Sequence, residues 1–415
     1  MRLQTLITVA LFAGIFCIIG CSKNDTVNII PAPTPTAGTT NNVTTTVDPY
    51  AAIKLAFGTN IDPTSLENYA NQAKPAYILK NNLGNNTITD KTATLGRVLF
   101  YDKNLSINNT ISCASCHKQN FAFGDTAVVS VGVEGGLTIR HSMRLINTRF
   151  ANEAKFFWNE RATNLNIQTT MPIVDHLEMG FSGENGRGNI NTLLNKLTTI
   201  SYYKELFKFT FGDTLVTENR IQISLASFVN SIQSFDSKYD IGRAQVNNDN
   251  QAFPNFTAQE NQGKTLFTTA PVFNASGLRT TGGLGCNACH NAPEFDIDPN
   301  TLNNGIIGIA NSTNGIDITN TRAGTLRDIT NATGAINTPM MHTGVLRSLR
   351  AVINHYNTIN LNPRNTNLDQ RLRPGGNGQN LNVTEAEIAA VVAFMQTLGG
   401  NNVYVNKKWS SPFLN

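Results

Sequence analysis

The heptapeptide "ISCASCH", residues 111–117, decides how this 415-residue chain is to be interpreted. Its last five residues are Cys-x-x-Cys-His, and the same pattern returns as "CNACH" at residues 286–290. Such a motif is found in redox disulfides, in zinc sites and at points of covalent haem attachment, which imply three unrelated functions. The remaining sequence discriminates among them.

The cysteine count favours the third alternative. The chain has six cysteines, and all but Cys17 and Cys21 lie in the two motifs. Two disulfides would not require a histidine directly after each cysteine pair. A zinc site built from both pairs would draw its ligands from distant segments, whereas structural zinc sites usually use a compact one. We therefore expect two c-type haems, held by Cys113, Cys116, Cys286 and Cys289, with His117 and His290 as iron ligands.

The N-terminus predicts export and a lipid anchor. Arg2 precedes the apolar run "LITVALFAGIFCIIG", residues 6–20, and the last residues before Cys21 resemble a bacterial lipobox. An uncleaved membrane anchor is the alternative, but it needs about 20 apolar residues. We expect a signal peptide over 1–20, lipidation at Cys21, a Thr/Asn/Pro-rich flexible tether over 21–48, and a periplasmic or outer-membrane lipoprotein of a Gram-negative bacterium.

The fold class follows from what surrounds the motifs. Gly-basic-x-Leu-Phe occurs at residues 96–100 and again at 263–267, on a helical spacing, before each motif. Amphipathic helices are predicted later, over 218–235 and 384–400. The second begins with a capping box of Thr384 and Glu387 and is expected to stop at Gly399, and the box Thr257–Glu260 opens the helix before "CNACH".

This repeated arrangement predicts an all-α chain with two cytochrome c-like haem domains in tandem and long loops. We place the N-terminal domain at 49–250, the C-terminal domain at 251–400 and a tail at 401–415. The net charge of +4 is too small to indicate nucleic acid as a partner.

The chain resembles the bacterial di-haem cytochrome c peroxidases and their MauG-type relatives. The resemblance spans about residues 90–400. It rests on "LFYDKNLSINNTISCASCH", "FFWNERATNLNIQTTMPIVDHLEMGFSG", "FTAQENQGKTLF", "CNACH" and "TPMMHTGVLRSLRAVINHYN". It implies that the N-terminal haem reacts with peroxide and that the C-terminal haem transfers electrons.

The resemblance also implies catalytic residues. Trp158 matches a tryptophan that lies between the haems, although a buried core aromatic is the plainer interpretation. Gln168 and Glu178 match residues beside the peroxide, where the carboxylate moves a proton between the two oxygens and the amide holds the substrate. His176 is an alternative base, less favoured than Glu178.

Two departures concern the first haem. Many relatives carry an iron-binding histidine after Ser-x-Gly, but here residues 130–132 are followed by Val133, so this haem is expected to be five-coordinate at rest. His141, the remaining candidate ligand, stands where relatives commonly have a calcium-binding asparagine. Since calcium prefers amide and carbonyl oxygens, calcium is only an open alternative, with carbonyls of Asn337 and Pro339 as further ligands.

A third departure concerns the second haem. Peroxidases typically have a methionine as its distal ligand, and this chain has Tyr356, as MauG-type enzymes do. A phenolate lowers the potential of the iron relative to a thioether. Met340 and Met341 are the rival ligands, and packing alone is the remaining interpretation.

We therefore expect an enzyme that reduces hydrogen peroxide to water, with electrons from a small cytochrome c or cupredoxin. The rivals are a MauG-type oxidase acting on a protein or aromatic substrate, and a non-enzymatic di-haem electron carrier. The sequence does not predict the oligomeric state.

Overall fold

The computed structural model describes residues 48–84 and 86–414, so the predicted signal peptide, Cys21 and nearly all of the tether lie outside the described residues. Residues Asp48–Asn415 form one compact unit. No helix among the described residues is long and apolar enough to cross a membrane.

The described chain is rich in helices, as expected. The α-helices are α1 (Ala51–Phe57), α2 (Asp90–Tyr101), α3 (Cys113–Cys116), α4 (Leu165–Val174), α5 (Ile190–Thr199), α6 (Ser201–Phe211), α7 (Glu218–Ser231), α8 (Lys238–Arg243), α9 (Ala258–Thr268), α10 (Leu349–Asn357), α11 (Glu385–Gln396) and α12 (Asn402–Val405). Short 3-10 helices are η1 (Gly58–Asn60), η2 (Lys103–Leu105), η3 (Gln119–Phe121), η4 (Val133–Gly135), η5 (Cys286–Ala288), η6 (Gln370–Leu372), η7 (Pro374–Gly376) and η8 (Lys407–Trp409).

Two short antiparallel ribbons, which the sequence did not predict, complete the secondary structure. Strand β1 (Pro271–Phe273) pairs with β2 (Arg279–Gly282), and β3 (His290–Asn291) pairs with β4 (Asp296–Ile297). The second ribbon begins at the histidine of the second motif.

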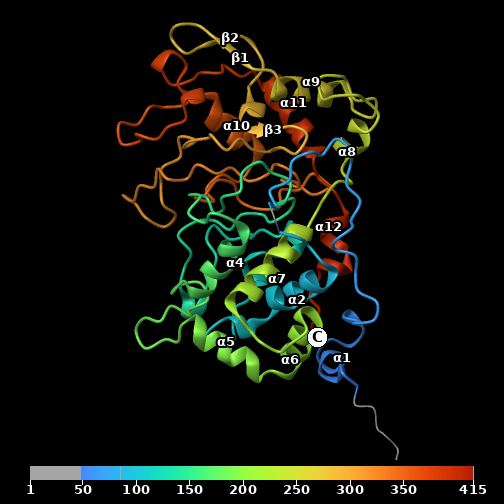
Figure 1. The fold of residues 1–415 in the computed structure, drawn as a ribbon. Helices are drawn as coiled ribbons and strands as arrows, with labels where there is room; N and C mark the ends of the chain where they lie inside the picture. The colour runs from blue at the N-terminus through green and yellow to red at the C-terminus, as the bar shows by residue number, and fades with distance from the viewer. Residues whose placement is uncertain (1–47, 85, 415) are drawn as a thin grey trace, which may run out of the picture. The chain divides into compact units, whose positions relative to one another are not determined.

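Two helix pairs organise the fold, α2 with α7 and α9 with α11 (Figure 1). A Cβ added at Gly96 of α2 would lie 1.9 Å from the Ser224 carbonyl oxygen of α7, and one added at Gly263 of α9 would lie 1.9 Å from the Ala390 carbonyl oxygen of α11. Only glycine permits backbones to approach this closely. The repeated glycine of the sequence pattern is therefore the contact point of each crossing.

The basic residue after each glycine is also used alike. Arg97 is 3% exposed and donates from Nε to the Ser410 carbonyl at 2.7 Å. Lys264 is 2% exposed and donates from Nζ to the Gln251 carbonyl at 2.7 Å. Each cation thus holds a loop against its helix through backbone carbonyls, which explains why a charge follows the glycine in both copies.

Each helix pair lies in its own apolar core. The α2–α7 core contains Phe100 and Phe228, and the α9–α11 core contains Phe267 and Phe394. The C-terminal segment returns to the first core, where Trp409 is fully buried and its carbonyl accepts a hydrogen bond from the Tyr101 hydroxyl at 2.6 Å. The segment after α11 therefore packs with residues from the first half of the chain.

The predicted helix limits are largely confirmed. Thr257 caps α9 and Thr384 caps α11, both with the predicted capping boxes. The helix predicted over 218–235 ends at Ser231, and α11 ends at Gln396. Gly399 does not terminate α11, because the helix has ended before it. A Cβ there would meet the Thr330 carbonyl oxygen at 2.5 Å, so this glycine serves a close backbone contact.

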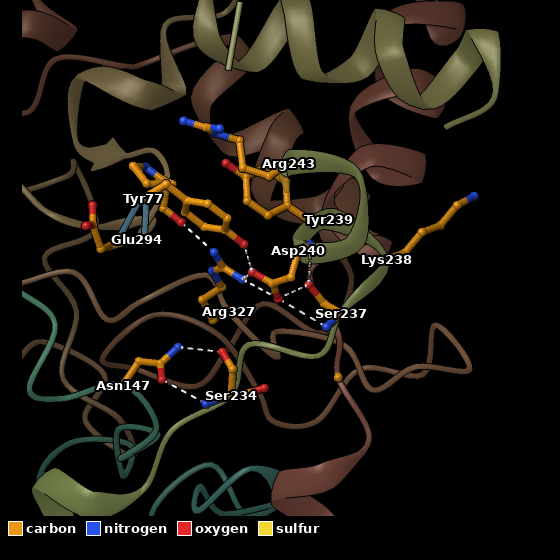
Figure 2. Close-up of polar contacts among 12 residues, drawn as sticks. Tyr77, Asn147, Ser234, Ser237, Lys238, Tyr239, Asp240, Arg243, Glu294 and Arg327 are labelled. Carbon is orange, nitrogen blue, oxygen red and sulfur yellow. Dashed lines mark hydrogen bonds and ion pairs between the residues drawn. The ribbon is translucent and has the colours of Figure 1, made fainter. Parts of the chain in front are cut away.

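A buried ion pair joins α8 to a later loop (Figure 2). Arg327 is fully buried and donates from Nη1 to both carboxylate oxygens of Asp240, at 2.7 and 2.8 Å. The Tyr77 hydroxyl donates to the same carboxylate at 2.8 Å, and so does the Ser237 hydroxyl at 2.6 Å. This carboxylate raises the pKa of Arg327, although burial opposes it. Segments from the beginning, middle and end of the chain are thus fixed to one carboxylate.

Replacing either crossing glycine by alanine should destabilise the protein. An exposed Gly→Ala change in a helix gains up to about 1 kcal/mol, but here the new methyl group must push two helices apart, which typically costs about 1–3 kcal/mol. Urea unfolding of Gly96→Ala and Gly263→Ala should show the loss, while Gln259→Ala, on the exposed face of α9, should not. Unchanged unfolding midpoints would contradict the close contact.

Asp240→Asn should lower the free energy of unfolding by about 3–5 kcal/mol, because it leaves the Arg327 guanidinium buried without a counter-charge. The matched control is Asp213→Asn, which removes a carboxylate from an exposed pair with Arg220 and should leave stability nearly unchanged. Chemical denaturation of both variants measures their free energies of unfolding. Equal losses would contradict a special contribution of the Asp240–Arg327 pair to stability.

Candidate functional site

The first motif is held in a geometry that suits an iron-ligating histidine. Helix α3 covers the two cysteines, and the backbone N–H of His117 donates to the Cys113 carbonyl at 2.9 Å. The His117 Nδ1 lies 3.1 Å from the Phe123 carbonyl oxygen, so it carries the hydrogen and leaves Nε2 as the free acceptor. Burial lowers the pKa of His117. The imidazole is therefore oriented and neutral, as ligation requires.

The four motif cysteines are free thiols in the structure, which does not support the disulfide alternative. Burial raises the pKa of Cys113 and Cys286 to about 12 and that of Cys116 and Cys289 to about 11. A redox cysteine needs a lowered thiol pKa. Within the described ranges there is also no cluster of three or more His, Cys, Asp or Glu side chains suited to a metal ion. These buried thiols beside an oriented histidine fit covalent haem better than a redox or zinc site.

A cavity of about 230 Å³ lies beside the first motif. It joins the motif to the middle segment of the sequence, which the resemblance singled out for catalysis. Its lining includes Cys113, Cys116, His117, Trp158, Gln168 and Glu178. The structure thus brings all three predicted catalytic residues to the first attachment site, although Glu178 is separated from His117 by a long stretch of chain.

Glu178 is positioned by the turn that follows α4. Its backbone N–H donates to the Asp175 carboxylate at 3.0 Å, which fixes the turn. Burial raises the pKa of Glu178 to about 7; the Asp175 charge adds to this effect, and Arg161 opposes it. The group is consequently protonated and deprotonated in comparable amounts at neutral pH, which is the property of an efficient acid/base catalyst.

Gln168 comes from the middle of α4, whose N-terminus is capped by the Asn164 side chain. Its backbone N–H continues the helix by donating to the Asn164 carbonyl at 3.1 Å. The Gln168 side chain is half-buried at the cavity wall. A rigid helix therefore presents a neutral amide to the same cavity as the Glu178 carboxylate.

The loop with the Val133 departure packs directly beneath Glu178. The Val133 N–H donates to the Glu178 carbonyl at 2.9 Å, and a Cβ on Gly132 would lie 2.0 Å from the Leu177 carbonyl oxygen. Val133 is 2% exposed and is not part of the cavity lining, whereas Gly132 is. The buried valine packs under the turn that carries Glu178.

The other two histidines weighed for this site differ in their placement. His176 is outside the cavity lining, and its Nδ1 lies 2.9 Å from the Ser182 hydroxyl, so the alternative base points elsewhere. His141 does line the cavity, and its Nδ1 is 2.9 Å from the Ala127 carbonyl oxygen. Its backbone N–H donates to the His342 carbonyl at 2.7 Å. These bonds hold His141 in place.

Trp158 connects the two halves of the chain. Its indole Nε1 donates to the His141 carbonyl at 2.7 Å, and its own carbonyl accepts from the N–H groups of Thr321 and Arg322 at 2.9 and 3.0 Å. The ring meets that of His342 edge to face, with centroids 6.2 Å apart. The tryptophan is half-buried at the cavity wall, so it is more than a core aromatic.

At the second motif, η5 holds Cys286 and β3 begins at His290. Burial and the charge of Arg144 lower the pKa of His290 to about 4, which keeps the imidazole neutral. Burial raises the pKa of the Tyr356 hydroxyl on α10, and nearby Cys289 adds to the effect. Tyr356 is therefore a buried phenol close enough to the second motif for the two groups to interact electrostatically.

The three candidate iron ligands of the second site, Tyr356, Met340 and Met341, differ in their surroundings. The Asn304 amide nitrogen lies 3.3 Å from the Tyr356 hydroxyl and 3.2 Å from the Met341 sulfur. Met340 is 6% exposed and packs in the α9–α11 core. Tyr356 and Met341 thus share one amide, and Met340 lies among core side chains.

Some residues of the site were not found from the sequence. Arg144, Arg161 and Arg322 line the first cavity, and Asn304 links the rival ligands. They lie in irregular loops, where no periodicity or motif distinguishes them from ordinary surface residues. Asn337, weighed as a calcium ligand, donates from its amide to the Asp328 carbonyl and the Tyr404 hydroxyl, both at 2.7 Å.

Comparison with known proteins agrees with this arrangement. Residues 90–248 match the sequence model described as "Di-haem cytochrome c peroxidase". The chain is 26% identical over 325 residues to the methylamine utilization protein MauG of Methylophilus methylotrophus, covering 76% of this chain and 84% of the relative. It is 27% identical over 319 residues to cytochrome c551 peroxidase of Nitrosomonas europaea, covering 74% and 80%.

A solved structure gives the same result. A MauG-like protein associated with microbial copper homeostasis matches with a TM-score of 0.63 and 25% identity, over 82% of this chain and 99% of that one. The chain is therefore similar to the di-haem cytochrome c peroxidases in the broad sense that includes the MauG proteins, and the family model matches its residues 90–248.

Proposed function

We propose that the chain reduces hydrogen peroxide to water at its N-terminal haem site, with electrons entering at the C-terminal one. The observation that carries the proposal is the convergence of Glu178, Gln168 and Trp158 on the cavity beside His117, with the pKa of Glu178 at about 7. Haem bound at the two motifs would supply the redox-active iron. The overall reaction consumes one peroxide, two electrons and two protons and yields two waters.

The residues of the chain would handle the proton. The ionised Glu178 carboxylate accepts it from one peroxide oxygen and returns it to the other, which then leaves as water. The Gln168 amide on α4 orients the peroxide by hydrogen bonding. Partial burial excludes water, so that the proton is not lost to solvent during the transfer.

Trp158 lies on the path that electrons would take. Its hydrogen bond to the His141 carbonyl and its edge contact with His342 hold the indole against both halves of the chain. An aromatic ring that is held rigidly between two redox centres lowers the barrier for electron transfer between them, and the ring does not need to move. We assign Trp158 this role, and we assign entry of electrons to a small cytochrome c or cupredoxin docking near the second site.

A MauG-type oxidase is the second candidate. Tyr356 supports it, because this buried phenol interacts electrostatically with Cys289 of the second motif, and a phenolate ligand there would lower the potential of the iron. The similarity to MauG proteins supports it as well. In that case the oxidising equivalents would be used on a protein or aromatic substrate.

Two further parts of the proposal concern place and organisation. We propose that the signal at residues 1–20 exports the chain, that Cys21 carries the lipid, and that the protein works in the periplasm. We also propose a division near residue 250 into two haem domains, supported by the separate cores around α2–α7 and α9–α11.

Resting-state electron paramagnetic resonance of the purified protein tests the function. We expect one high-spin ferric signal from the N-terminal haem, because Val133 offers no ligand, and one low-spin signal from the C-terminal haem. Two low-spin signals would contradict the open N-terminal site and favour an electron carrier. Peroxide turnover with reduced cytochrome c then distinguishes a peroxidase from an oxidase.

Glu178→Gln should slow peroxide turnover by about 10²-fold or more with haem content intact, because the amide cannot accept the proton. In the unmodified protein, turnover should rise with pH through about 7, since the carboxyl is protonated and inactive as a base below its pKa. The variant should lack this dependence.

Glu184→Gln is the matched control, since it makes the same change at an exposed position of the same segment. Steady-state assays over a pH series measure peroxide turnover by the unmodified protein and by the two variants. If Glu178→Gln and Glu184→Gln turn over peroxide equally well, Glu178 has no place in the mechanism.

A further inference from the structure

Arg144 is a half-buried cation at the wall of the first cavity with an incomplete set of partners. Its Nη2 donates to the Thr325 carbonyl at 2.6 Å, and its Nη1 donates to the Thr338 hydroxyl at 3.3 Å. The Nε–H is buried and has no acceptor among the described residues. A guanidinium has five N–H donors, and the contacts found here satisfy two, both with neutral oxygens.

No carboxylate compensates this charge. None lies within ion-pair distance of Arg144 in residues 48–84 and 86–414. Asp328, whose charge acts on the pKa of Arg144, accepts instead from the Gly400 N–H and the Tyr404 hydroxyl, at 2.8 and 3.0 Å. Burial lowers the pKa of Arg144, yet a guanidinium stays protonated at neutral pH. The fully buried Arg327, by contrast, pairs with Asp240.

The position of Arg144 relates it to the first attachment site. The guanidinium lines the same cavity as Cys113, Cys116 and His117. A Cβ on Gly124 would lie 3.0 Å from the Cγ of Arg144, so the stem of the arginine is packed against the turn that holds His117. Arg144 is thus held at the wall of the cavity beside the first motif.

A cation with a buried N–H donor and no counter-charge costs free energy. The site is therefore suited to bind an anion. Haem brings carboxylates in its two propionates. We propose that Arg144 binds a propionate of the N-terminal haem through Nε–H and an unused Nη–H, and that its charge sets the reduction potential of that haem. The inference rests on the proposed function, because it requires covalent haem at the first motif.

The charge has a predictable effect on redox equilibrium. Ferric haem carries one more positive charge than ferrous haem, so a nearby cation disfavours the oxidised form and raises the reduction potential. Removing the cation also leaves the propionate charge uncompensated, which acts in the same direction. Loss of Arg144 must therefore lower the potential of the N-terminal haem, and this effect does not depend on catalysis.

The experiment begins with the haem content and the spectroelectrochemical titration of the unmodified full-length protein. Arg144→Gln removes the charge and should shift the reduction potential of the N-terminal haem downward. Arg144→Lys keeps the charge, so its potential should lie nearer to that of the unmodified protein. Arg149→Gln makes the same charge change in the same loop outside the cavity lining and should shift neither haem. Resonance Raman propionate-bending bands should move in both Arg144 variants and stay unchanged in Arg149→Gln.

The outcomes separate this inference from the proposed function. Arg144→Gln with two haems, unchanged potentials and unchanged propionate bands would overturn the propionate site while leaving peroxidase activity standing. An unmodified protein without covalent haem would overturn both. If Arg144→Gln does not accumulate as a folded haem protein, the propionate band of Arg144→Lys tests the inference instead. A propionate band displaced by loss of the planar guanidinium, at nearly constant potential, supports the inference, and an unmoved band contradicts it.

Discussion

The fold depends on two helix crossings in which a glycine lets one backbone touch another. In the first, Gly96 lies against the Ser224 carbonyl, and in the second, Gly263 lies against the Ala390 carbonyl, at matching distances. The motif cysteines come after α2 and after α9, so each crossing sets the place of one attachment site. A single stereochemical constraint, used twice, accounts for the repeated sequence pattern and for the two separate cores.

The chemistry of the first site depends on a second close backbone contact. The loop at Gly132 and Val133 is pressed against the carbonyls of Leu177 and Glu178. That contact fixes the turn that carries Glu178, whose pKa burial raises to about 7. In the proposed mechanism, the residue at position 133 thus matters twice, by offering no iron ligand and by supporting the turn that carries the base.

Arg327 and Arg144 differ in the partners of their guanidinium groups. Arg327 has a dedicated carboxylate, Asp240, and the pair joins distant segments. Arg144 has only neutral oxygens and an unused Nε–H beside the first cavity. Arg97 also donates only to backbone carbonyls, but Arg144 differs from it in lining the first cavity with a buried Nε–H that has no acceptor. This unused donor at the cavity wall is the physical basis for assigning Arg144 to a carboxylate of the cofactor.

Much of this could be predicted from the sequence, because the information was local. The attachment motifs, the capping boxes at Thr257 and Thr384 and the helical spacing around Gly96 and Gly263 all depend on residues a few positions apart, and the structure confirms the helices and their caps. The end of α11 was predicted too late, because Gly399 is needed for a contact with the distant Thr330 rather than for a cap.

Tertiary structure alone decided which side chains meet. It brought Glu178 and His117 to one cavity, left His176 outside it, placed Tyr356 and Met341 on one amide and put Arg144 at the wall of the same cavity. These contacts join irregular loops far apart in the chain, so no periodicity records them. The sequence by itself determined the two attachment motifs and their helices, whereas burial, and with it the pKa of Glu178 and the unpaired charge of Arg144, exists only once the chain has folded and excluded water.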